Sequence, residues 1–417
     1  MRPLRHVIAI PLAILTASVT GASAPATGRA PIVVGCGVAA PRVQQWRTLT
    51  DGPLTLRTIR CFDLPNEWRS PLQLSPDGRS VFTFDAKNGL FIAPTAEGGK
   101  VCRAPLTLGV NIIGSGGDYW PAVWRSDSRG VWAADQRIMA PRGGWALEPK
   151  RPVVVSLNGQ IRRMPALLNP SGGLDGIFWI GDGGLALATL GAGGGYYKPE
   201  LSNATPTLAL IDARRGRIIQ TAPMTAITGL PFNSVSGVSG VVDRHGRPRV
   251  LMWFGPDRWY EWTPGAAPRH VLPGNKSRPK FSLTPDGLRV LIATGLSATG
   301  MICEHNPKCP PPTPVTGVAA ELRDVETGKL IWEIRATARM FSSTMRPVTS
   351  RDGRYALITL PGDGQVRDTI ALIAMSDGRI VQRVNQAPGG GTAGFGADGR
   401  SVWVGDGMSV AVYDLRD

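Results

Sequence analysis

The sequence predicts an all-β fold, a seven-bladed β-propeller, from three observations. One turn followed by one apolar run recurs along the chain, as in LSPDGRSVFTFD (74–85) and LTPDGLRVLIAT (283–294). Glycine (52 residues) and proline (36 residues) are abundant although 42% of the residues are hydrophobic, which is typical of many short strands joined by tight turns. The last repeat has three strand-like runs and no fourth, whereas a spare run stands before the first repeat. Radial repeats of β-sheets have this pattern.

The first element in chain order is an export signal, assigned to residues 1–24. Arg2 and Arg5 form a positive start, and residues 7–19 (VIAIPLAILTASV) form an apolar stretch. Ala22-Ser23-Ala24 then supplies the small residues of a cleavage site. The apolar stretch is too short to span a bilayer, and no later run is long enough, so we expect no transmembrane segment. These features predict a periplasmic or secreted protein.

An N-terminal extension (25–53) and then the propeller (54–417) are expected after this signal. VVGC, which ends at Cys36, resembles a lipoprotein cleavage box, but Pro25, Arg29 and Pro31 separate it from the apolar stretch. The run LTLRTIRCF (54–62) has a strand composition and precedes the first blade. We expect it to be the outer strand of the last blade, so that the N-terminal segment closes the ring in a three-plus-one arrangement without an open sheet edge.

In each blade a tight turn joins the first strand to the second. In SPDG the proline has a preset φ, the aspartate accepts hydrogen bonds from nearby backbone, and the glycine tolerates positive φ. The apolar run after the turn is the second strand, and two further strands joined by a second tight turn complete the blade. The seven blades are expected at 71–104, 121–165, 176–222, 239–273, 280–335, 347–384 and 392–415. Two packed β-sandwiches are the alternative architecture.

The repeats resemble those of WD-repeat-like and TolB-type propellers. The SPDGR turn carries the resemblance, together with RDVETGKLIWEIR (323–335), which is similar to the third-strand, turn and fourth-strand segment of such families. The sequence lacks the recurrent Gly-His and Trp-Asp pairs of WD-repeats and an obvious separate N-terminal domain of the TolB type. The resemblance therefore implies the architecture and carries over no site residue and no partner.

Connection lengths divide the predicted propeller into two unequal faces. The turns between strands one and two (1–2 turns) and three and four (3–4 turns) lie on one side, the short-turn face, and are nearly all tight. The connections between strands two and three and between blades lie on the other side, the long-loop face. They include the longest excursions, 109–120, 135–150, 191–206, 221–234 and 295–317. Because long loops on a regular scaffold usually carry function, we expect the binding surface on the long-loop face.

Aromatic and charged residues within these loops are the candidate binding residues, because rigid aromatics beside charges suit protein partners and glycans. They are Asp118, Tyr119, Trp120, Arg137, Tyr196, Tyr197, Lys198 and His305. The alternative for Tyr119 and Trp120 is a place in the core at the start of a blade.

The five cysteines all follow the predicted cleavage point. Cys303 and Cys309 enclose a short segment and are expected to form a disulfide, as suits an oxidising compartment. Zinc bound with His305 is the alternative, but a structural zinc site needs four ligands and no second pair is near in sequence. Cys61 with Cys102 is a weaker candidate pair.

The sequence favours a binding role and leaves catalysis open. Formal net charge is +15; an exported basic protein can meet anionic glycans, lipid headgroups or acidic protein faces, and we expect no nucleic-acid partner. We expect no cofactor and no metal site. The leading hypothesis is a non-catalytic propeller that binds a protein partner or an anionic cell-envelope glycan. The alternatives are a lyase or lactonase that uses carboxylates such as Asp363, Asp368 and Asp406 with a divalent metal, or the heavy subunit of a periplasmic oxidoreductase.

Overall fold

The structure is a computed structural model. It describes residues 32–34, 36, 49–62, 72–85, 89–96, 99–106, 122–135, 138–139, 146–147, 151–164, 174–181, 184–190, 207–223, 237–243, 245–254, 258–272, 279–296, 298, 313–339, 344–362, 368–385, 392–406 and 409–416. Contacts divide the chain into Met1–Ala30 and Pro31–Asp417, and every described residue belongs to the second part.

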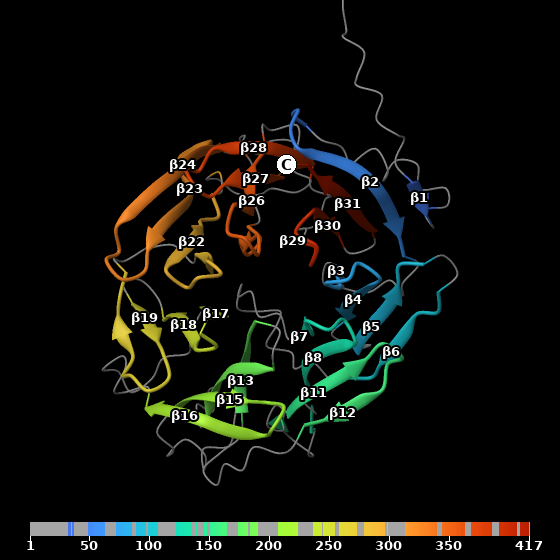
Figure 1. Ribbon diagram of the computed structural model, residues 1–417, viewed down its shortest axis with the longest axis vertical. Coiled ribbons are helices and arrows are strands. Elements are labelled where there is room, and N and C mark those ends of the chain that lie inside the picture. Colours follow the sequence, from blue (N-terminus) through green and yellow to red (C-terminus); the bar gives the residue numbers. More distant parts are fainter. Residues whose placement is uncertain are drawn as a thin grey trace, which may run out of the picture. The chain divides into compact units, whose positions relative to one another are not determined.

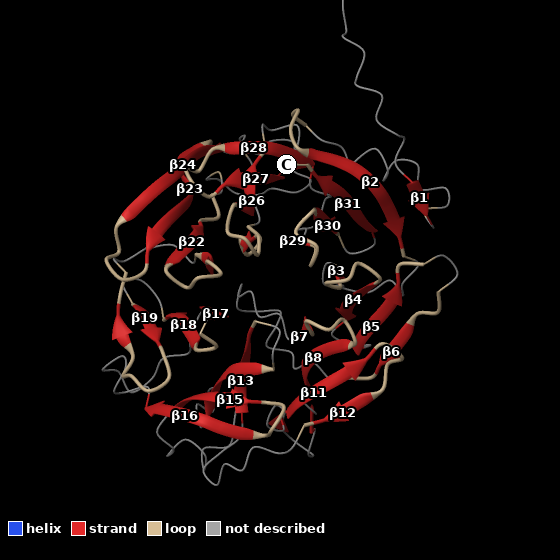
Figure 2. Cartoon of the chain, viewed as in Figure 1, coloured by secondary structure: helices blue, strands red, loops and turns tan. Residues whose placement is uncertain are grey.

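The predicted seven-bladed β-propeller is confirmed. The described residues contain strands and no helix (Figure 2). The strands form seven antiparallel blade sheets and one separate two-stranded ribbon. The blades follow one another around a ring, with their first strands toward the centre and their last strands at the rim (Figure 1).

The first four blades take their strands in chain order. Blade one contains β3 (Gln73–Leu74), β4 (Ser80–Asp85), β5 (Gly89–Pro94) and β6 (Cys102–Ala104). Blade two contains β7 (Ala122–Trp124), β8 (Gly130–Asp135), β11 (Arg151–Ser156) and β12 (Ile161–Arg163). Blade three contains β13 (Leu174–Ile180), β14 (Leu185–Leu190), β15 (Thr207–Asp212) and β16 (Arg217–Pro223). Blade four contains β17 (Gly237–Val242), β18 (Pro248–Trp253), β19 (Trp259–Trp262) and β20 (Arg269–His270).

The last three blades continue this order until the seventh, which also uses the N-terminal strands. Blade five contains β21 (Lys280–Leu283), β22 (Arg289–Ala293), β23 (Val315–Asp324) and β24 (Leu330–Ala338). Blade six contains β25 (Val348–Thr349), β26 (Tyr355–Pro361), β27 (Asp368–Ala374) and β28 (Ile380–Asn385). Blade seven contains β29 (Thr392–Phe395), β30 (Ser401–Gly405), β31 (Ser409–Leu415), β2 (Leu54–Cys61) and β1 (Ile32–Val34).

The 1–2 turns have the local chemistry that their sequence implies. In blade one, the Asp77 carboxylate accepts hydrogen bonds from the Ser75 hydroxyl (2.6 Å) and from the Arg79 backbone N–H (3.0 Å). Gly78 has a φ of 71°, a left-handed conformation that glycine adopts without strain. In blade two the same position is Ser128, at a φ of 55°. The aspartates of the turns therefore organise backbone, as expected from the SPDG pattern.

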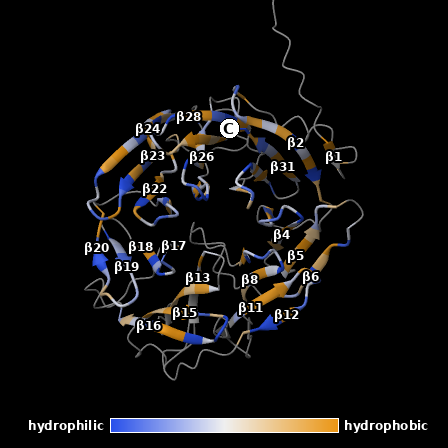
Figure 3. Cartoon of the chain, viewed as in Figure 1, coloured by the Kyte–Doolittle hydropathy of each residue, from blue (hydrophilic) through white to orange (hydrophobic). Residues whose placement is uncertain are grey.

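The core lies between neighbouring sheets rather than at the centre of the ring. Phe82 and Leu90 of blade one pack with Trp124 and Val153 of blade two in one buried cluster. A similar cluster joins blades four and five, and another joins blades six and seven. The central strands β26 and β27 are buried on both faces, which explains why their sequences are almost continuously apolar (Figure 3).

The ends of the chain meet in the seventh sheet. β2 pairs antiparallel with β31 from Leu54 opposite Leu415 to Cys61 opposite Ser409. β1 then pairs parallel with β2, with Ile32 opposite Thr58, and forms an additional edge strand. The Gln382 side chain of blade six reaches this seam. Its Oε1 accepts the Leu54 N–H (2.5 Å), and its Nε2 donates to the carbonyl oxygens of Leu54 (3.0 Å) and Thr50 (3.1 Å).

A disulfide fastens the added strand. Cys61 at the end of β2 is bonded to Cys36, two residues beyond β1. The weaker candidate pair of Cys61 with Cys102 is therefore wrong, because the Cys61 sulfur is already bonded. Cys102, on the outer strand β6, is the one free cysteine among the described residues. Cys303 and Cys309 lie outside the described residues, so their disulfide stays a prediction.

Candidate functional site

The unequal length of the connections on the two faces is confirmed. On the short-turn face, the 1–2 turns contain five residues in six blades and four in blade three, and the longest 3–4 turn has seven residues (95–101). On the long-loop face, 105–121 has 17 residues, 191–206 has 16 and 294–314 has 21. The strand ends that carry these connections are paired within their sheets, as Leu190 is with Thr207. The long connections of the long-loop face thus begin and end at regularly paired strands.

Two ribbons extend the sheets on the long-loop face. In blade two, the connection between β8 and β11 contains its own hairpin, β9 (Ile138–Met139) paired with β10 (Ala146–Leu147). In blade five, β23 and β24 continue past the end of β22, so that Val315 pairs with Ala338 beyond the last pair made by Ala293. The first of these segments lies within the predicted loop 135–150, so the hairpin is a difference from the prediction. β9 and β10 have only two residues each, and so short a run gives little alternation of apolar and polar residues from which to predict a strand.

The strand ends beneath the long-loop face are tied between blades seven and one. The Leu72 N–H donates to the Asp406 carbonyl (2.7 Å), and the Thr392 hydroxyl donates to the Leu72 carbonyl (2.8 Å). A side chain at Gly405 would place its Cβ 2.6 Å from that Leu72 oxygen, so the close approach requires glycine. Segment 107–121 leaves the scaffold after Leu106, which is buried in the neighbouring core cluster. The long connection from blade one to blade two thus begins beside a buried residue.

The predicted binding residues of this face lie outside the described residues. These are Asp118, Tyr119, Trp120, Arg137, Tyr196, Tyr197, Lys198 and His305. The structure places the strands on either side of them: β6 and β7 around the first three, β8 and β9 around Arg137, and β14 and β15 around the tyrosine pair. Their role as binding residues stays a prediction.

The carboxylates considered for catalysis have local partners where they are described. Asp406 follows β30 and is buried; its Oδ1 accepts the Ser409 N–H (2.5 Å), and its own N–H donates to the Ser409 carbonyl (2.9 Å). It therefore organises the turn into β31. Asp368 is buried as the first residue of β27, and Asp363 lies outside the described residues. No group of three or more His, Cys, Asp or Glu side chains suited to a metal ion occurs in the described part of the chain.

The described histidines do not converge on this face. His245 lies in the 1–2 turn of blade four, on the short-turn face, where its N–H donates to the Asp243 carboxylate. His270 is on the outer strand β20, with its ring edge-on to Tyr260 at 5.5 Å between centroids. A turn and an outer strand of blade four thus hold the two described histidines away from the long-loop face.

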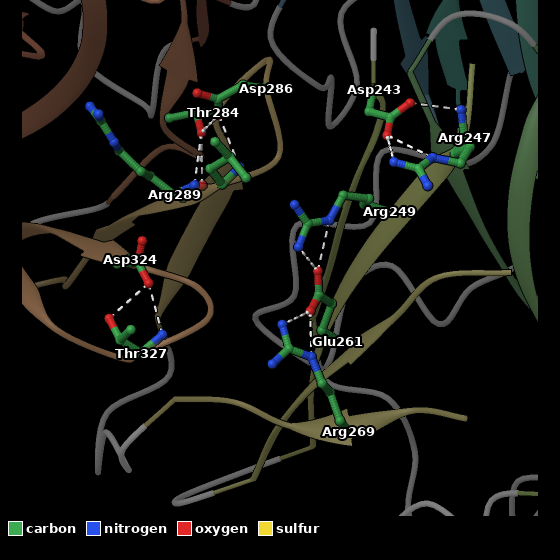
Figure 4. Close-up of polar contacts among 11 residues, drawn as sticks. Asp243, Arg247, Arg249, Glu261, Arg269, Thr284, Asp286, Arg289, Asp324 and Thr327 are labelled. Atoms are coloured by element: carbon green, nitrogen blue, oxygen red, sulfur yellow. Dashed lines mark hydrogen bonds and ion pairs between the residues drawn. The ribbon is translucent and has the colours of Figure 1, made fainter. Parts of the chain in front are cut away.

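A buried cluster of charged side chains joins three strands of blade four near their short-turn ends. Glu261 of β19 is buried between Arg249 of β18 and Arg269 of β20 (Figure 4). The Arg249 Nε donates to Glu261 Oε1 at 2.8 Å, and the Arg269 Nε donates to Oε2 at 2.9 Å. Both carboxylate oxygens are thus bound by guanidinium groups that are charged at all relevant pH values. This arrangement ties the three outer strands of blade four together.

The turn aspartates are held in their charged form. Desolvation acts to raise the pKa of Asp352, but hydrogen bonds from the Ser350 hydroxyl and the Arg354 side chain and N–H lower it to about 2. In Asp127 desolvation is likewise outweighed by hydrogen bonds from Arg125 and Arg129, which lower the pKa. Hydrogen bonds from the Thr327 backbone N–H and hydroxyl lower the pKa of Asp324 (Figure 4). These low pKa values follow from turn geometry and indicate structural rather than acid–base roles.

None of the described segments forms a helix that could cross a membrane. No protein-family model matches the sequence, and no curated protein matches it. The comparisons therefore assign the chain to neither the WD-repeat nor the TolB type. The structure shows a seven-bladed propeller whose longest connections lie on the long-loop face.

Proposed function

We propose that the protein is an exported, non-catalytic propeller that binds a protein partner or an anionic cell-envelope glycan through its long-loop face. The observation that carries this proposal is the concentration of long connections and projecting ribbons on one side of a scaffold whose other side has only tight turns. Insertions on one face of a rigid fold are where binding sites usually occur.

The proposed contact residues are the aromatic and charged side chains of these connections. Tyrosine and tryptophan lose little conformational entropy on binding and supply a large contact area, and adjacent charges give orientation. Tyr196, Tyr197 and Lys198 stand together between β14 and β15 and are the first set to test. Lys198 and Arg137 suit a partner that carries carboxylate or sulfate groups.

Binding is tested with the mature chain (25–417) immobilised and presented with uronate-containing and sulfated oligosaccharides and, separately, with a native envelope protein extract. The variant Tyr196→Ala/Tyr197→Ala/Lys198→Ala should weaken binding at least about tenfold, since loss of central aromatic contacts typically costs 2 kcal/mol or more. The matched control replaces Gln160, Glu326 and Lys329, which are exposed on the short-turn face. Equal binding by both variants contradicts the proposed site.

Export is tested independently. The protein isolated from its native host should begin at Pro25 when its N-terminus is sequenced, and it should fractionate outside the cytoplasm. A protein that retains Met1 and stays in the cytoplasm contradicts this part of the proposal without affecting the binding test.

A further inference from the structure

The short-turn face repeats one exposed basic residue. In five of the 1–2 turns, the residue directly after the left-handed position is an exposed arginine; these are Arg79, Arg129, Arg247, Arg354 and Arg400. Backbone geometry requires the aspartate and the glycine of the turn, but it does not require arginine at this place. In blade five the same position is Leu288, which is 54% exposed. The recurrence of arginine is therefore not explained by the turn itself.

Three of these arginines have guanidinium groups without an ion-pair partner among the described residues. They are Arg400 of blade seven, Arg79 of blade one and Arg129 of blade two, which belong to consecutive blades. By contrast, the Arg354 Nε lies 2.5 Å from Asp352 Oδ2, and Arg247 Nη2 lies 3.1 Å from Asp243 Oδ2. Beside Arg129, the Asp127 carboxylate is already paired with Arg125.

Hydrogen bonds between the turns hold these three arginines in one rigid arc. The Ala397 N–H of blade seven donates to the Pro76 carbonyl of blade one (3.0 Å). The Asp77 N–H of blade one donates to the Ser128 hydroxyl of blade two (3.1 Å). Within each turn, the arginine N–H is bound by its own aspartate, at 3.0 Å for both Arg79 and Arg129 and at 2.9 Å for Arg400. The backbone positions of the arginines are thus fixed relative to one another.

Large aliphatic side chains are exposed on the same face. Leu288 and Val242 lie in and beside the 1–2 turns of blades five and four, and Leu157 and Leu330 lie in or next to 3–4 turns. These four are half of the exposed large hydrophobic residues of the described chain. Six of the seven 1–2 turns have five residues, so the arginines and Leu288 occupy equivalent positions in their blades around the ring. A linear anionic polymer can contact only part of a ring of turns at once. A flat anionic surface, such as a lipid bilayer, can contact many of the turns together.

We propose that the short-turn face binds the surface of an anionic lipid bilayer. Arg79, Arg129 and Arg400 contact headgroup phosphates by charge-assisted hydrogen bonds, and Leu288 with the neighbouring aliphatics enters the interface. The full sequence has a net charge of +15, and removal of Arg2 and Arg5 with the signal leaves +13 (15 − 2), which adds long-range attraction to an anionic surface. Binding in this orientation leaves the long-loop face directed away from the bilayer and free for its own partner.

The test is co-sedimentation of the mature chain with vesicles of phosphatidylcholine alone and of phosphatidylcholine mixed with phosphatidylglycerol. We expect binding to the mixed vesicles only, and less binding at high salt. The variant R79S/R129S/R400S should lower the partition coefficient by about 100-fold, from about 1 kcal/mol for each arginine near an anionic surface. The control R103S/R163S/R335S removes the same charge from the outer strands β6, β12 and β24 and should lower it much less.

A second variant separates lipid contact from charge alone. Leu288→Asn leaves the charge unchanged and should lower the partition coefficient several-fold, because an exposed aliphatic side chain no longer enters the interface. Equal losses in the two arginine variants would overturn the proposal. So would retention on immobilised polyglutamate in the absence of vesicle binding, which would assign the arc to a soluble acidic partner. Unchanged circular dichroism and melting temperature establish that each variant is folded.

Discussion

Replacing Gln382 by alanine should destabilise the protein by about 3 kcal/mol. The side chain is 2% exposed and makes three hydrogen bonds to backbone groups of the N-terminal segment, two at Leu54 and one at Thr50. A neutral hydrogen bond contributes about 1 kcal/mol net, and removing the amide leaves the buried Leu54 N–H without its acceptor. The loss should fall on the attachment of β2, because Leu54 is the first residue of that strand.

The assay is urea unfolding followed by tryptophan fluorescence, with the free energy of unfolding extrapolated to water. Gln160→Ala is the control, since that residue is exposed in a 3–4 turn; it should change the free energy by less than about 0.5 kcal/mol. Gln382→Glu keeps an acceptor for Leu54 but directs a carboxylate at two carbonyl oxygens. Its folded-state pKa should be raised, so this variant should lose stability as the pH rises above about 4.3.

Two results would refute the reasoning. Gln382→Ala within about 1 kcal/mol of the wild-type protein would mean that water replaces the amide at no cost, contrary to the burial of the site. Gln382→Glu as stable as the wild-type protein at neutral pH would mean that the amide does not donate to the two carbonyl oxygens.

Three other changes probe separate parts of the scaffold. The double variant Cys36→Ser/Cys61→Ser opens a loop with a sequence separation of 25 and should lower the free energy of unfolding by about 3 kcal/mol in urea; reductant should lower that of the wild-type protein equally. Glu261→Gln leaves two arginines without their shared carboxylate and should cost about 2 kcal/mol by the same assay, whereas an unchanged midpoint would show that solvent already screens the pair. Asp352 has a folded-state pKa of about 2, below its unfolded value, so its contribution is present above about pH 4 and is lost as the pH falls toward 2. Asp352→Asn should therefore flatten the pH dependence of the unfolding midpoint in this range, and identical curves would contradict the assignment.

The sequence was sufficient to predict the blades because each depends on local signals. The turn chemistry of Ser75 to Arg79 recurs, and the apolar runs that follow it are long enough to be read as buried strands. The pairing partner of residues 54–62 was also predictable, since blade seven had no fourth strand of its own and no other run was unassigned. β2 does lie beside β31.

Other features of the structure could not be predicted from the sequence. β1 is a three-residue strand that pairs in parallel, and its sequence IVV differs little from many apolar triplets in the chain. Because this pairing brings Cys36 near Cys61, their disulfide was not predictable from cysteine spacing either. The arginine after the turn is visible in the sequence of five blades, but in blade five Leu288 takes its place, and the sequence alone does not show which of these arginines lack an ion-pair partner. The predicted binding residues lie in long connections, where no periodicity limits the backbone.

The position of β31 near the end of the sequence affects the order in which the seventh sheet can form during synthesis. β2 emerges early from the ribosome, but its partner Leu415 follows Leu54 by most of the chain length, so one edge of β2 waits for nearly the whole polypeptide. The opposite edge can be occupied at once by β1, and the Cys36–Cys61 bond can keep it occupied. The early unit of two parallel strands thus exposes only one edge of β2 to aggregation while the other blades assemble. Loss of the last few residues, which belong to β31, should consequently impair folding more severely than loss of an equal number from an outer strand such as β12.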